Sequence, residues 1–417
     1  MKTYLVGGAV RDIFMGLQPK DIDFVVVGSS TEEMLADGFE KVGADFPVFL
    51  KMGSEYALAR REKKTGTGYL GFTSEFGPDV TLEEDLGRRD LTINSMAIGE
   101  NCGPVDPLES LVDPYNGLSD IKNRILRHTS DAFAEDPVRV LRLARFRARL
   151  GAEWTVAPET QKLVARMAKK GVLNELTAER VWKELSRALM EPYARLFFDT
   201  LLECDALRAV FPEVFRLVMT PEPRVFHPEG NAYEHTMLVL TQAVLNGYDL
   251  ETRFACLVHD FGKTVTPFDM LPNHHGHEVV GVPVVEDFCK RLTVPSRMRE
   301  TSVKVSRYHM YMHLMEELNN KTLVRMFMDA GAFNHPEFVD VLYRVGVCDT
   351  RGRKGAEESS VAALARLHVA WDAARATRFV DVFPEGETNV NKIKEGLYRA
   401  RIRNVAIAIK EQFDTLA

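Results

Sequence analysis

The sequence predicts an α+β protein in which an N-terminal part of mixed strands and helices precedes a long helical remainder. Up to about residue 125, short apolar runs alternate with glycine, proline and aspartate; from about Pro137 onward, apolar residues recur with helical spacing and β-branched runs become rare. The 417 residues, 45% hydrophobic and 27% charged, suffice for several globular domains and exclude a fibrous or disordered chain.

The apolar runs, and the glycine, proline and aspartate residues between them, predict the individual strands and helices in order. Strands are expected at Tyr4–Val6, Phe24–Val27, Phe46–Leu50 and Tyr56–Ala59, with a helix at Thr31–Lys41. The glycine-rich stretch Arg60–Asp85 is expected to be a mobile loop. Helical periodicity predicts helices at Val138–Leu150, Ala157–Ala168, Ala178–Met190, Tyr193–Cys204 and Asn391–Phe413.

These patterns divide the chain into four expected parts. They are a head at 1–125, a helical neck and body at 126–220, a histidine-rich domain at 221–350 and a helical tail at 351–417, with a proline cluster (Pro221, Pro223, Pro228) as linker. The net charge of −7 means that a polyanion would need a local basic patch.

Cysteine usage and hydropathy predict the compartment. Five scattered cysteines without a CxxC pair fit a reducing cytoplasm and exclude a disulfide framework or a zinc finger. No run of about 18 apolar residues and no signal-peptide core occurs, so we expect a cytoplasmic protein without a membrane partner. The sequence leaves a monomer and a homodimer both open.

Two aspartates stand at the mouth of an apolar strand. Because side chains alternate along a strand, Asp21 and Asp23 are expected on one face. Two close like charges are costly unless a cation compensates them, and Mg²⁺ favours few carboxylates together with waters and phosphates. The pair is a candidate Mg²⁺ site, although a lone Asp-x-Asp is more often a solvated turn at a strand edge.

Phosphate-binding features flank the aspartates. Upstream, a strand runs into Gly7-Gly8 and the start of a helix, where glycines let backbone approach a phosphate and Arg11 adds a planar cation. The pattern is neither a dinucleotide fingerprint nor a Walker A motif. Downstream, Arg88 and Arg89 alone would be a helix-capping cluster; beside Gly8 and Arg11 they are candidate triphosphate clamps.

Taken together, these motifs resemble those of the bacterial tRNA nucleotidyltransferases (CCA-adding enzymes) and their poly(A) polymerase relatives. The matching segments are Gly7-Gly8-x-Val10-Arg11-Asp12, Asp21-x-Asp23, Arg88-Arg89-Asp90-Leu91-Thr92-Ile93-Asn94, Asp113-Pro114-Tyr115-Asn116-Gly117-Leu118-Ser119-Asp120-Ile121 and Glu135-Asp136-Pro137-Val138-Arg139. The resemblance implies a polymerase-β-like head in which two Mg²⁺ ions on Asp21 and Asp23 promote nucleotidyl transfer to a tRNA. The wider superfamily has a third carboxylate; Glu55 and Glu62 are the candidates and the ligand stays unassigned.

An arginine face follows the Glu135-Asp136 pair. Arg139, Arg142, Arg145 and Arg149 share one arc of the expected helix, which is a solvated basic face or a binding surface. A carboxylate accepts from the exocyclic amine of cytosine or adenine and rejects the carbonyl of guanine or uracil. By resemblance, Asp136 and Arg139 select C and A, with Arg142 and Arg145 towards the nucleotide or primer end.

Eight of the eleven histidines lie within residues 227–313. His235, His259, Asp260 and Asp349 supply imidazole and carboxylate ligands that suit Mn²⁺, Ni²⁺, Fe, Zn²⁺ or Mg²⁺. His259-Asp260-Phe261-Gly262-Lys263 resembles the HD-domain metal phosphohydrolases, and the alternative is a degenerate, structural helical domain. His274, His275 and His277 are candidate outer ligands, phosphate binders or solvated loop residues. Met310 follows His309, where a second carboxylate would have helped a dinuclear site.

The resulting prediction is an α+β head, a helical neck and body and an all-α HD domain. The expected activity is addition of C, C and A to tRNA from CTP and ATP. The HD part is expected to hydrolyse phosphoesters such as 2′,3′-cyclic phosphates with Ni²⁺ or Mn²⁺, with His259 and Asp260 catalytic. The rivals are a poly(A) polymerase of the same family, an HD phosphohydrolase with a nucleotide-sensing head, and a non-catalytic RNA-binding protein.

Overall fold

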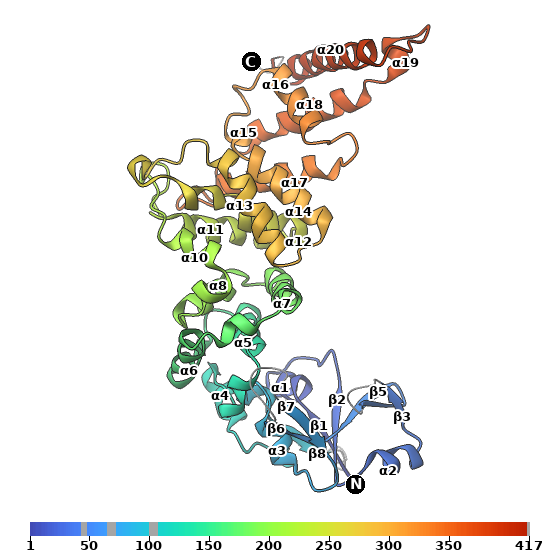
Figure 1. Ribbon diagram of the computed structural model, residues 1–417, viewed down its shortest axis with the longest axis vertical. Helices are drawn as coiled ribbons and strands as arrows, with labels where there is room; N and C mark the ends of the chain where they lie inside the picture. Colours follow the sequence, from blue (N-terminus) through green and yellow to red (C-terminus); the bar gives the residue numbers. More distant parts are fainter. Residues whose placement is uncertain (43–47, 65–71, 100–106, 415–417) are drawn as a thin grey trace. The chain divides into compact units, whose positions relative to one another are not determined.

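The computed structural model of the protein describes residues 1–42, 48–64, 72–99 and 107–414 (Figure 1). The chain folds into two compact units: Met1–Glu184 with Leu196–Val210, and Leu185–Arg195 with Phe211–Ala417. None of the helices in the described ranges is long and apolar enough to cross a membrane.

A seven-stranded mixed sheet, in the order β3-β4-β5-β2-β1-β8-β9, forms the base of the N-terminal unit. Its strands are β1 (Lys2–Val6), β2 (Asp23–Val27), β3 (Glu40–Val42), β4 (Val48–Lys51), β5 (Ser54–Leu58), β8 (Ala97–Gly99) and β9 (Leu111–Val112). Strand β2 is antiparallel to β1 and parallel to β5, so Asp23 lies opposite Val6 on one side and Glu55 on the other. The strand that begins with Asp23 is therefore central in the sheet.

The four expected strands are confirmed, although Phe46 lies outside the described residues. The helix expected at Thr31–Lys41 was too long: α2 (Thr31–Ala36) ends before Gly38, whose φ of 80° turns the chain towards β3. The loop expected at Arg60–Asp85 was wrong where the structure describes it. There β6 (Arg60–Lys64) and β7 (Phe72–Phe76) pair antiparallel, and α3 (Leu82–Gly87) follows.

Helices make up most of the rest of the N-terminal unit. They are α1 (Gly8–Phe14), α4 (Gly117–Asn123), α5 (Val138–Leu150), α6 (Pro158–Lys169), α7 (Ala178–Met190), α8 (Arg195–Glu203) and α9 (Leu207–Val210), with a short parallel pair of β10 (Ile125–Leu126) and β11 (Thr155–Val156). The periodicity predicts four of these helices, α5 to α8, of which the end of α7 belongs to the second unit. Helix α5 has both expected ends, and it buries Val140, Leu141, Ala144 and Ala148 as expected. Leu143 and Phe146 are buried as well, so the apolar arc is wider than expected.

The second unit is built almost wholly from helices. They are α10 (Pro212–Val218), α11 (Ala232–Leu245), α12 (Leu250–Val258), α13 (His277–Arg291), α14 (Ser296–Tyr308), α15 (Met310–His313), α16 (Asn320–Asp329), α17 (Glu337–Arg351), α18 (Ala365–Ala376), α19 (Phe379–Val382) and α20 (Val390–Ile409), which continues as a π-helical turn at Lys410–Asp414 (Figure 1). One apolar core joins α11, α12, α16, α17, α18 and α20, and it buries Phe327, Phe338 and Leu342 completely or almost completely.

Gly262 brings two segments of the histidine-rich domain together. A Cβ atom at this position would lie 2.0 Å from the backbone oxygen of His277, so only glycine lets the start of α13 pack here. Since Gly262 follows Asp260 by two residues, this contact sets the first residue of α13 beside the His259-Asp260 pair. The close approach thus builds part of the histidine cluster.

Candidate functional sites

The head carboxylates lie together at the start of β2. Burial raises the pKa of Asp23 and the Asp21 charge adds to this rise, while the Arg89 charge opposes it, so the three groups lie within electrostatic reach. Glu55 stands opposite Asp23 on the parallel strand, and residues in register on paired strands project to the same face. Glu55 is therefore the better candidate for the third carboxylate; the side chain of Glu62 lies outside what the structure describes.

Two arginines approach the diglycine. Gly7 has a φ of 71°, and a Cβ there would lie 3.0 Å from Nη1 of Arg89; a Cβ at Gly8 would lie 3.5 Å from Nη2 of Arg11. The buried Asp85 orients Arg89, whose Nη2 lies 3.0 Å from Oδ2 of that carboxylate. The predicted cluster of glycines, Arg89 and the aspartates is thus brought together in space.

Arg11 is held inside the protein. Its Nε and Nη2 lie 2.9 and 2.7 Å from Oδ1 of Asp12, and its Nη1 donates to Oδ1 of Asn94 at 2.7 Å. The residue is 4% exposed, and burial lowers its pKa. Arg11 thus links the diglycine motif to the Thr92-Ile93-Asn94 segment, and its contact with a triphosphate stays a prediction.

Asp90 connects the head to α5, which sequence reasoning missed. Its Oδ2 accepts from Nε of Arg142 at 2.7 Å and lies 2.7 Å from Nη2. Its Oδ1 accepts from the backbone nitrogen of Leu91 at 2.9 Å and from Nδ2 of Asn94 at 3.0 Å. Burial by itself raises the pKa of Asp90, but Arg142 and the Asn94 amide outweigh it and hold that pKa below its usual value.

The predicted base-selecting residues lie at the start of α5. Oδ1 of Asp136 accepts from the backbone nitrogen of Val138 at 3.1 Å, and its Oδ2 accepts from Arg180 at 2.7 Å. Nη1 of Arg139 donates to the backbone oxygen of Ala132 at 2.7 Å. Asp136 and Arg139 are therefore neighbours with defined orientations, and their selecting role stays a prediction.

Arg142 and Arg145 of α5, together with Arg11 of α1, lie around the buried ring of Phe146, and Arg149 lies 3.8 Å from Asp12. The guanidinium carbons of Arg11, Arg142 and Arg145 lie 5.3, 5.8 and 5.5 Å from the centroid of Phe146. Nε of Arg145 donates to Glu184 at 2.7 Å, with both side chains largely buried. Arg142 and Arg145 therefore have structural partners, and contact with a nucleotide or primer stays a prediction for both.

In the second unit, the four predicted metal ligands converge. His235 comes from α11, His259 and Asp260 from the end of α12, and Asp349 from α17. Nε2 of His235 lies 3.1 Å from Oδ1 of Asp349 and 3.5 Å from Oδ2 of Asp260, and Nε2 of His259 lies 3.2 Å from the same Oδ2. Adjacent residues on a straight helix point in different directions. Because the chain bends after α12, His259 and Asp260 both reach one centre.

Two further histidines meet the other oxygen of Asp260. Nε2 of His277 and of His309 lie 3.1 and 3.4 Å from Oδ1, and 3.0 Å from each other. Met310 supplies no carboxylate after His309, as the sequence indicates, but Asp260 lies beside both groups and can serve each of them. Asp260 separates a His235–His259–Asp349 group from a His277–His309 group, each of which can hold a cation.

The donor atoms fit divalent metal. The Nδ1 atoms of His259, His277 and His309 lie 2.7–2.8 Å from backbone oxygens, which fixes the ring tautomer and aims each Nε2 at the centre. Nε2 of His259 and both oxygens of Asp260 are buried, and among the described residues they have only ion-pair contacts and no hydrogen bond. Buried polar atoms without partners are costly, and cations at these positions would satisfy them.

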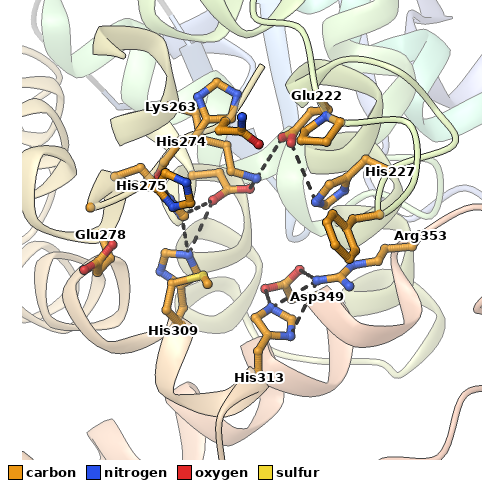
Figure 2. A pocket seen from close by; sticks show the side chains of 17 residues that line it. Glu222, His227, Lys263, His274, His275, Glu278, His309, His313, Asp349 and Arg353 are labelled. Atoms are coloured by element: carbon orange, nitrogen blue, oxygen red, sulfur yellow. Dashed lines mark hydrogen bonds and ion pairs between the residues drawn. The ribbon is translucent and has the colours of Figure 1, made fainter. Parts of the chain in front are cut away.

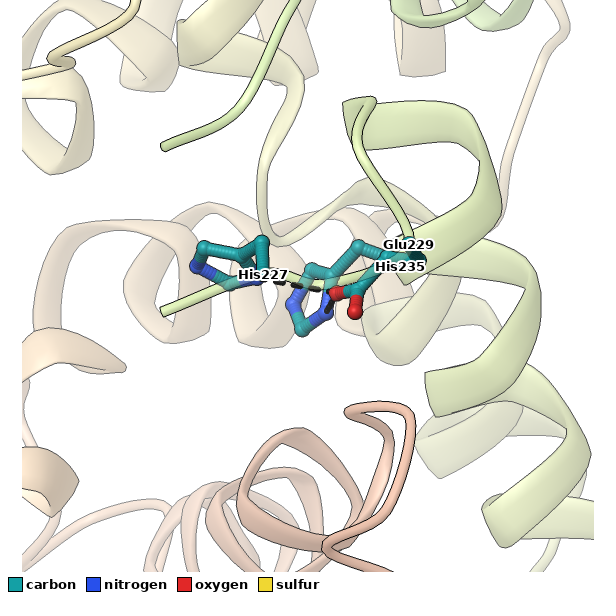
Figure 3. A group of neighbouring side chains, drawn as sticks. All are labelled: His227, Glu229 and His235. Carbon is teal, nitrogen blue, oxygen red and sulfur yellow. Dashed lines mark hydrogen bonds and ion pairs between the residues drawn. The ribbon is translucent and has the colours of Figure 1, made fainter. Parts of the chain in front are cut away.

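Charged neighbours support the cluster. Nζ of Lys263 lies 2.7 Å from Asp260 and 2.7 Å from Glu222, and these two carboxylates raise the pKa of Lys263 above its usual value despite burial. Nδ1 of His235 lies 3.2 Å from Oε1 of Glu229, and His227 approaches the same oxygen at 3.0 Å (Figure 3). Burial alone lowers the pKa of His235, but Asp349 and Glu229 raise it to about 9, so cation binding there would displace a proton.

A cavity of about 500 Å³ opens beside these groups, and His309, His313, Asp349 and Lys263 face it (Figure 2). His274 is a structural residue, because its Nε2 contacts the backbone oxygen of Pro221 at 2.9 Å and its Nδ1 contacts Thr266 at 2.7 Å. Of the three histidines expected as outer ligands, His277 thus joins the inner group and His274 does not. His275 lines the cavity.

Comparisons with known proteins agree with this architecture. Residues 3–127 match the poly A polymerase head domain, residues 154–217 the probable RNA and SrmB-binding site of polymerase A, and residues 232–365 the HD domain. A CCA-adding enzyme in apo form II is 19% identical with a TM-score of 0.65, covering 100% of this chain and 92% of its own. The CCA-adding enzyme of Bacillus stearothermophilus in complex with CTP is 19% identical with a TM-score of 0.63, covering 99% and 94%.

A CCA-adding enzyme in complex with ATP is 18% identical with a TM-score of 0.61, and the match covers 100% of this chain and 90% of that one. At these identities the likeness concerns the fold, and it confirms the predicted polymerase-type head, helical body and HD domain. The chain thus matches, in order, a poly A polymerase head domain, an RNA-binding region of polymerase A and an HD domain, and its fold is like that of the CCA-adding enzymes.

Proposed function

We propose that the protein adds C, C and A to the 3′ end of tRNA from CTP and ATP. The observation that carries the proposal is the head cluster, in which Asp23 starts the central strand, Asp21 lies just before it and Arg89 lies over Gly7. The structural relatives that contain CTP or ATP support the same substrates.

In this proposal, Asp21 and Asp23 hold two Mg²⁺ ions, with Glu55 as the third carboxylate. When bound, such ions help to deprotonate a 3′-hydroxyl and neutralise the charge of the departing pyrophosphate. Arg89, oriented by Asp85, binds triphosphate oxygens above the diglycine, where the two glycines carry no side chain of their own. The 3′ oxygen bonds to the α-phosphorus as the bond to pyrophosphate breaks.

Asp136 and Arg139 read the incoming base in place of a template strand. The carboxylate accepts from an exocyclic amine, which cytosine and adenine have and uracil and guanine lack at the corresponding position. Asp136 is held by the start of α5 and by Arg180, so its acceptor oxygens are fixed before a nucleotide arrives. Choice by fixed side chains fits an enzyme that adds a constant sequence.

The rival within the family, a poly(A) polymerase, uses ATP alone. The discriminating experiment supplies a tRNA lacking CCA with CTP, with ATP and with both, and sequences the 3′ ends. Addition of C with CTP alone, and of CCA only with both nucleotides, supports the proposal. A long A tract with ATP alone supports the rival, and no incorporation would favour a nucleotide-sensing head.

We also infer that the HD domain is a metal-dependent phosphohydrolase. The observation that carries this inference is the buried set of five ligand residues around Asp260, whose own oxygens form no hydrogen bond among the described residues. Ni²⁺ and Mn²⁺ suit imidazole and carboxylate together. The reaction transfers a phosphoryl group to water: a water oxygen bonds to phosphorus, the bond to a ribose oxygen breaks, and that oxygen takes the proton.

Its proposed substrates are 2′,3′-cyclic and 2′-phosphates. The test offers both to the wild type and to His259→Ala with Mg²⁺, Mn²⁺ or Ni²⁺ and measures the products. Hydrolysis by the wild type that His259→Ala abolishes supports the inference. Failure with every metal would favour a structural helical domain.

A further inference from the structure

The wall of the HD cavity opposite the His277–His309 group carries a cation with unused donors. Arg353 lines the cavity, and its Nε is buried without a hydrogen-bond partner in the described part of the chain. Its Nη2 lies 4.0 Å from Oδ1 of Asp349, which is long for an ion pair. Nη2 also lies 3.3 Å from Nε2 and 3.5 Å from Nδ1 of His313, both long for a hydrogen bond, and that Nε2 already donates to Oδ2 of Asp349 at 2.7 Å. A planar cation held this loosely suits a phosphate.

An exposed aromatic residue lines the same cavity. Phe226 is 65% exposed, although the cavity around it is lined mainly by charged and polar residues. Such a ring gains little from its place in the fold and offers a flat apolar face to a bound molecule. Any of the nucleobases can stack on an aromatic side chain. Phe226 is thus placed to contact a base whose phosphate lies further inside.

The segment that carries Phe226 is fixed to the metal-binding cluster. A backbone hydrogen bond of 3.1 Å from Glu222 to Gly230 closes the turn. Within it, Oε1 of Glu229 lies 3.2 Å from Nδ1 of His235 (Figure 3). Oε2 of Glu229 accepts from the backbone nitrogen of Lys354 at 3.4 Å. The carboxylate of Glu229 therefore links the segment that carries Phe226 to Lys354, the neighbour of Arg353, and to the ring of His235.

We propose that Phe226 and Arg353 form a nucleotide-binding subsite of the HD domain, in which Arg353 binds phosphate oxygens and Phe226 stacks on the base. This subsite rests on the phosphohydrolase function proposed above and narrows its substrates to phosphates attached to a ribonucleoside. The same chemistry occurs in a free nucleotide and at the 3′ end of an RNA. A phosphate ester without a base can contact Arg353 but has nothing to stack on Phe226.

The kinetic test uses the full-length protein with Ni²⁺ and compares adenosine 2′-phosphate with glycerol 2-phosphate. Phe226→Ala should raise KM for adenosine 2′-phosphate about tenfold and leave glycerol 2-phosphate unchanged, because only the former has a base to stack. Phe226→Trp should restore KM, and Val225→Ala, at the 86% exposed neighbour, should have no effect. Arg353→Lys should raise KM for both substrates. Equal effects of Phe226→Ala on both substrates would refute the base-binding role.

A binding measurement separates this proposal from the hydrolytic function. Titration calorimetry should show that Phe226→Ala binds adenosine 2′-phosphate about tenfold more weakly than the wild type does. If the wild type binds it in this Phe226-dependent way without hydrolysing it, the subsite stands and the phosphohydrolase function falls. If the wild type hydrolyses it while Phe226→Ala binds equally well, the subsite falls alone. An RNA ending in a 2′-phosphate, compared with the free nucleotide, shows which source of the chemistry is preferred.

Discussion

Replacing Asp136 by asparagine should blur the choice between CTP and UTP while leaving the fold nearly intact. Asparagine keeps a side-chain oxygen for the backbone nitrogen of Val138, which Asp136 caps at 3.1 Å. The lost ion pair with Arg180 is partly exposed, 28% for Arg180 and 21% for Asp136, so its removal should cost at most about 1 kcal/mol. The variant therefore isolates the chemistry of base choice from stability.

The magnitude follows from what the two side chains offer a base. The carboxylate of Asp136 only accepts, so the carbonyl of uracil leaves two acceptors facing each other, at a cost of about 1–3 kcal/mol. The amide of asparagine can turn its NH₂ group to that carbonyl and remove the cost. The ratio of kcat/KM for CTP to that for UTP should therefore fall by roughly tenfold or more.

The assay measures single-nucleotide incorporation into a tRNA lacking CCA, with CTP and UTP in separate reactions. Asp131→Asn is the matched control, since it removes one exposed carboxylate from the turn that precedes Asp136 and should leave the ratio unchanged. An unchanged ratio in the Asp136→Asn variant, with normal incorporation of CTP, would refute the selecting role and direct attention to Arg139.

Three other variants test the remaining assignments. Asp90→Asn should destabilise the N-terminal unit by roughly 3 kcal/mol in denaturant unfolding, because it leaves Arg142 without its carboxylate. Since the pKa of Asp90 is lowered in the fold, this contribution is present above about pH 4 and is lost as the pH falls below it; equal acid sensitivity of variant and wild type would contradict this. Glu55→Gln should slow nucleotide incorporation at least tenfold, whereas Glu40→Gln on β3 should not, and a normal Glu55→Gln rate would return the third ligand to Glu62. Asp260→Ala should abolish phosphohydrolysis and preserve CCA addition; loss of both activities would show that the two sites share folding or tRNA contacts.

Sequence patterns predicted those helices and strands whose residue spacing alone identifies them. Helix α5 was predicted to its ends, since the spacing of its apolar and arginine residues is a property of the helix itself. The β6–β7 hairpin was missed because charges, not alternating apolar residues, join its strands. Arg61 pairs with Glu75 at 3.2 Å and also reaches Asp79 and Glu84. A period-two hydrophobic pattern is absent from such a hairpin.

Site residues that belong to a recognised motif were predicted. Contacts that depend on how distant segments meet in the fold were not. His235, His259, Asp260 and Asp349 follow from the resemblance, and the structure places them together. No local feature separates His277, which joins the centre, from His274, which does not; the contact of Gly262 with the start of α13 makes that difference. The Asp90–Arg142 pair joins residues 52 positions apart and needed the tertiary fold.

Template-free addition of a fixed sequence by the head is tested most directly by the Asp23→Asn variant. Wild type and variant are incubated with a tRNA lacking CCA, CTP, ATP and Mg²⁺, and the 3′ ends are sequenced. The account predicts that the wild type ends its products in CCA, while the variant binds the tRNA with unchanged affinity and adds no nucleotide. CCA addition by the variant at the wild-type rate would contradict the account.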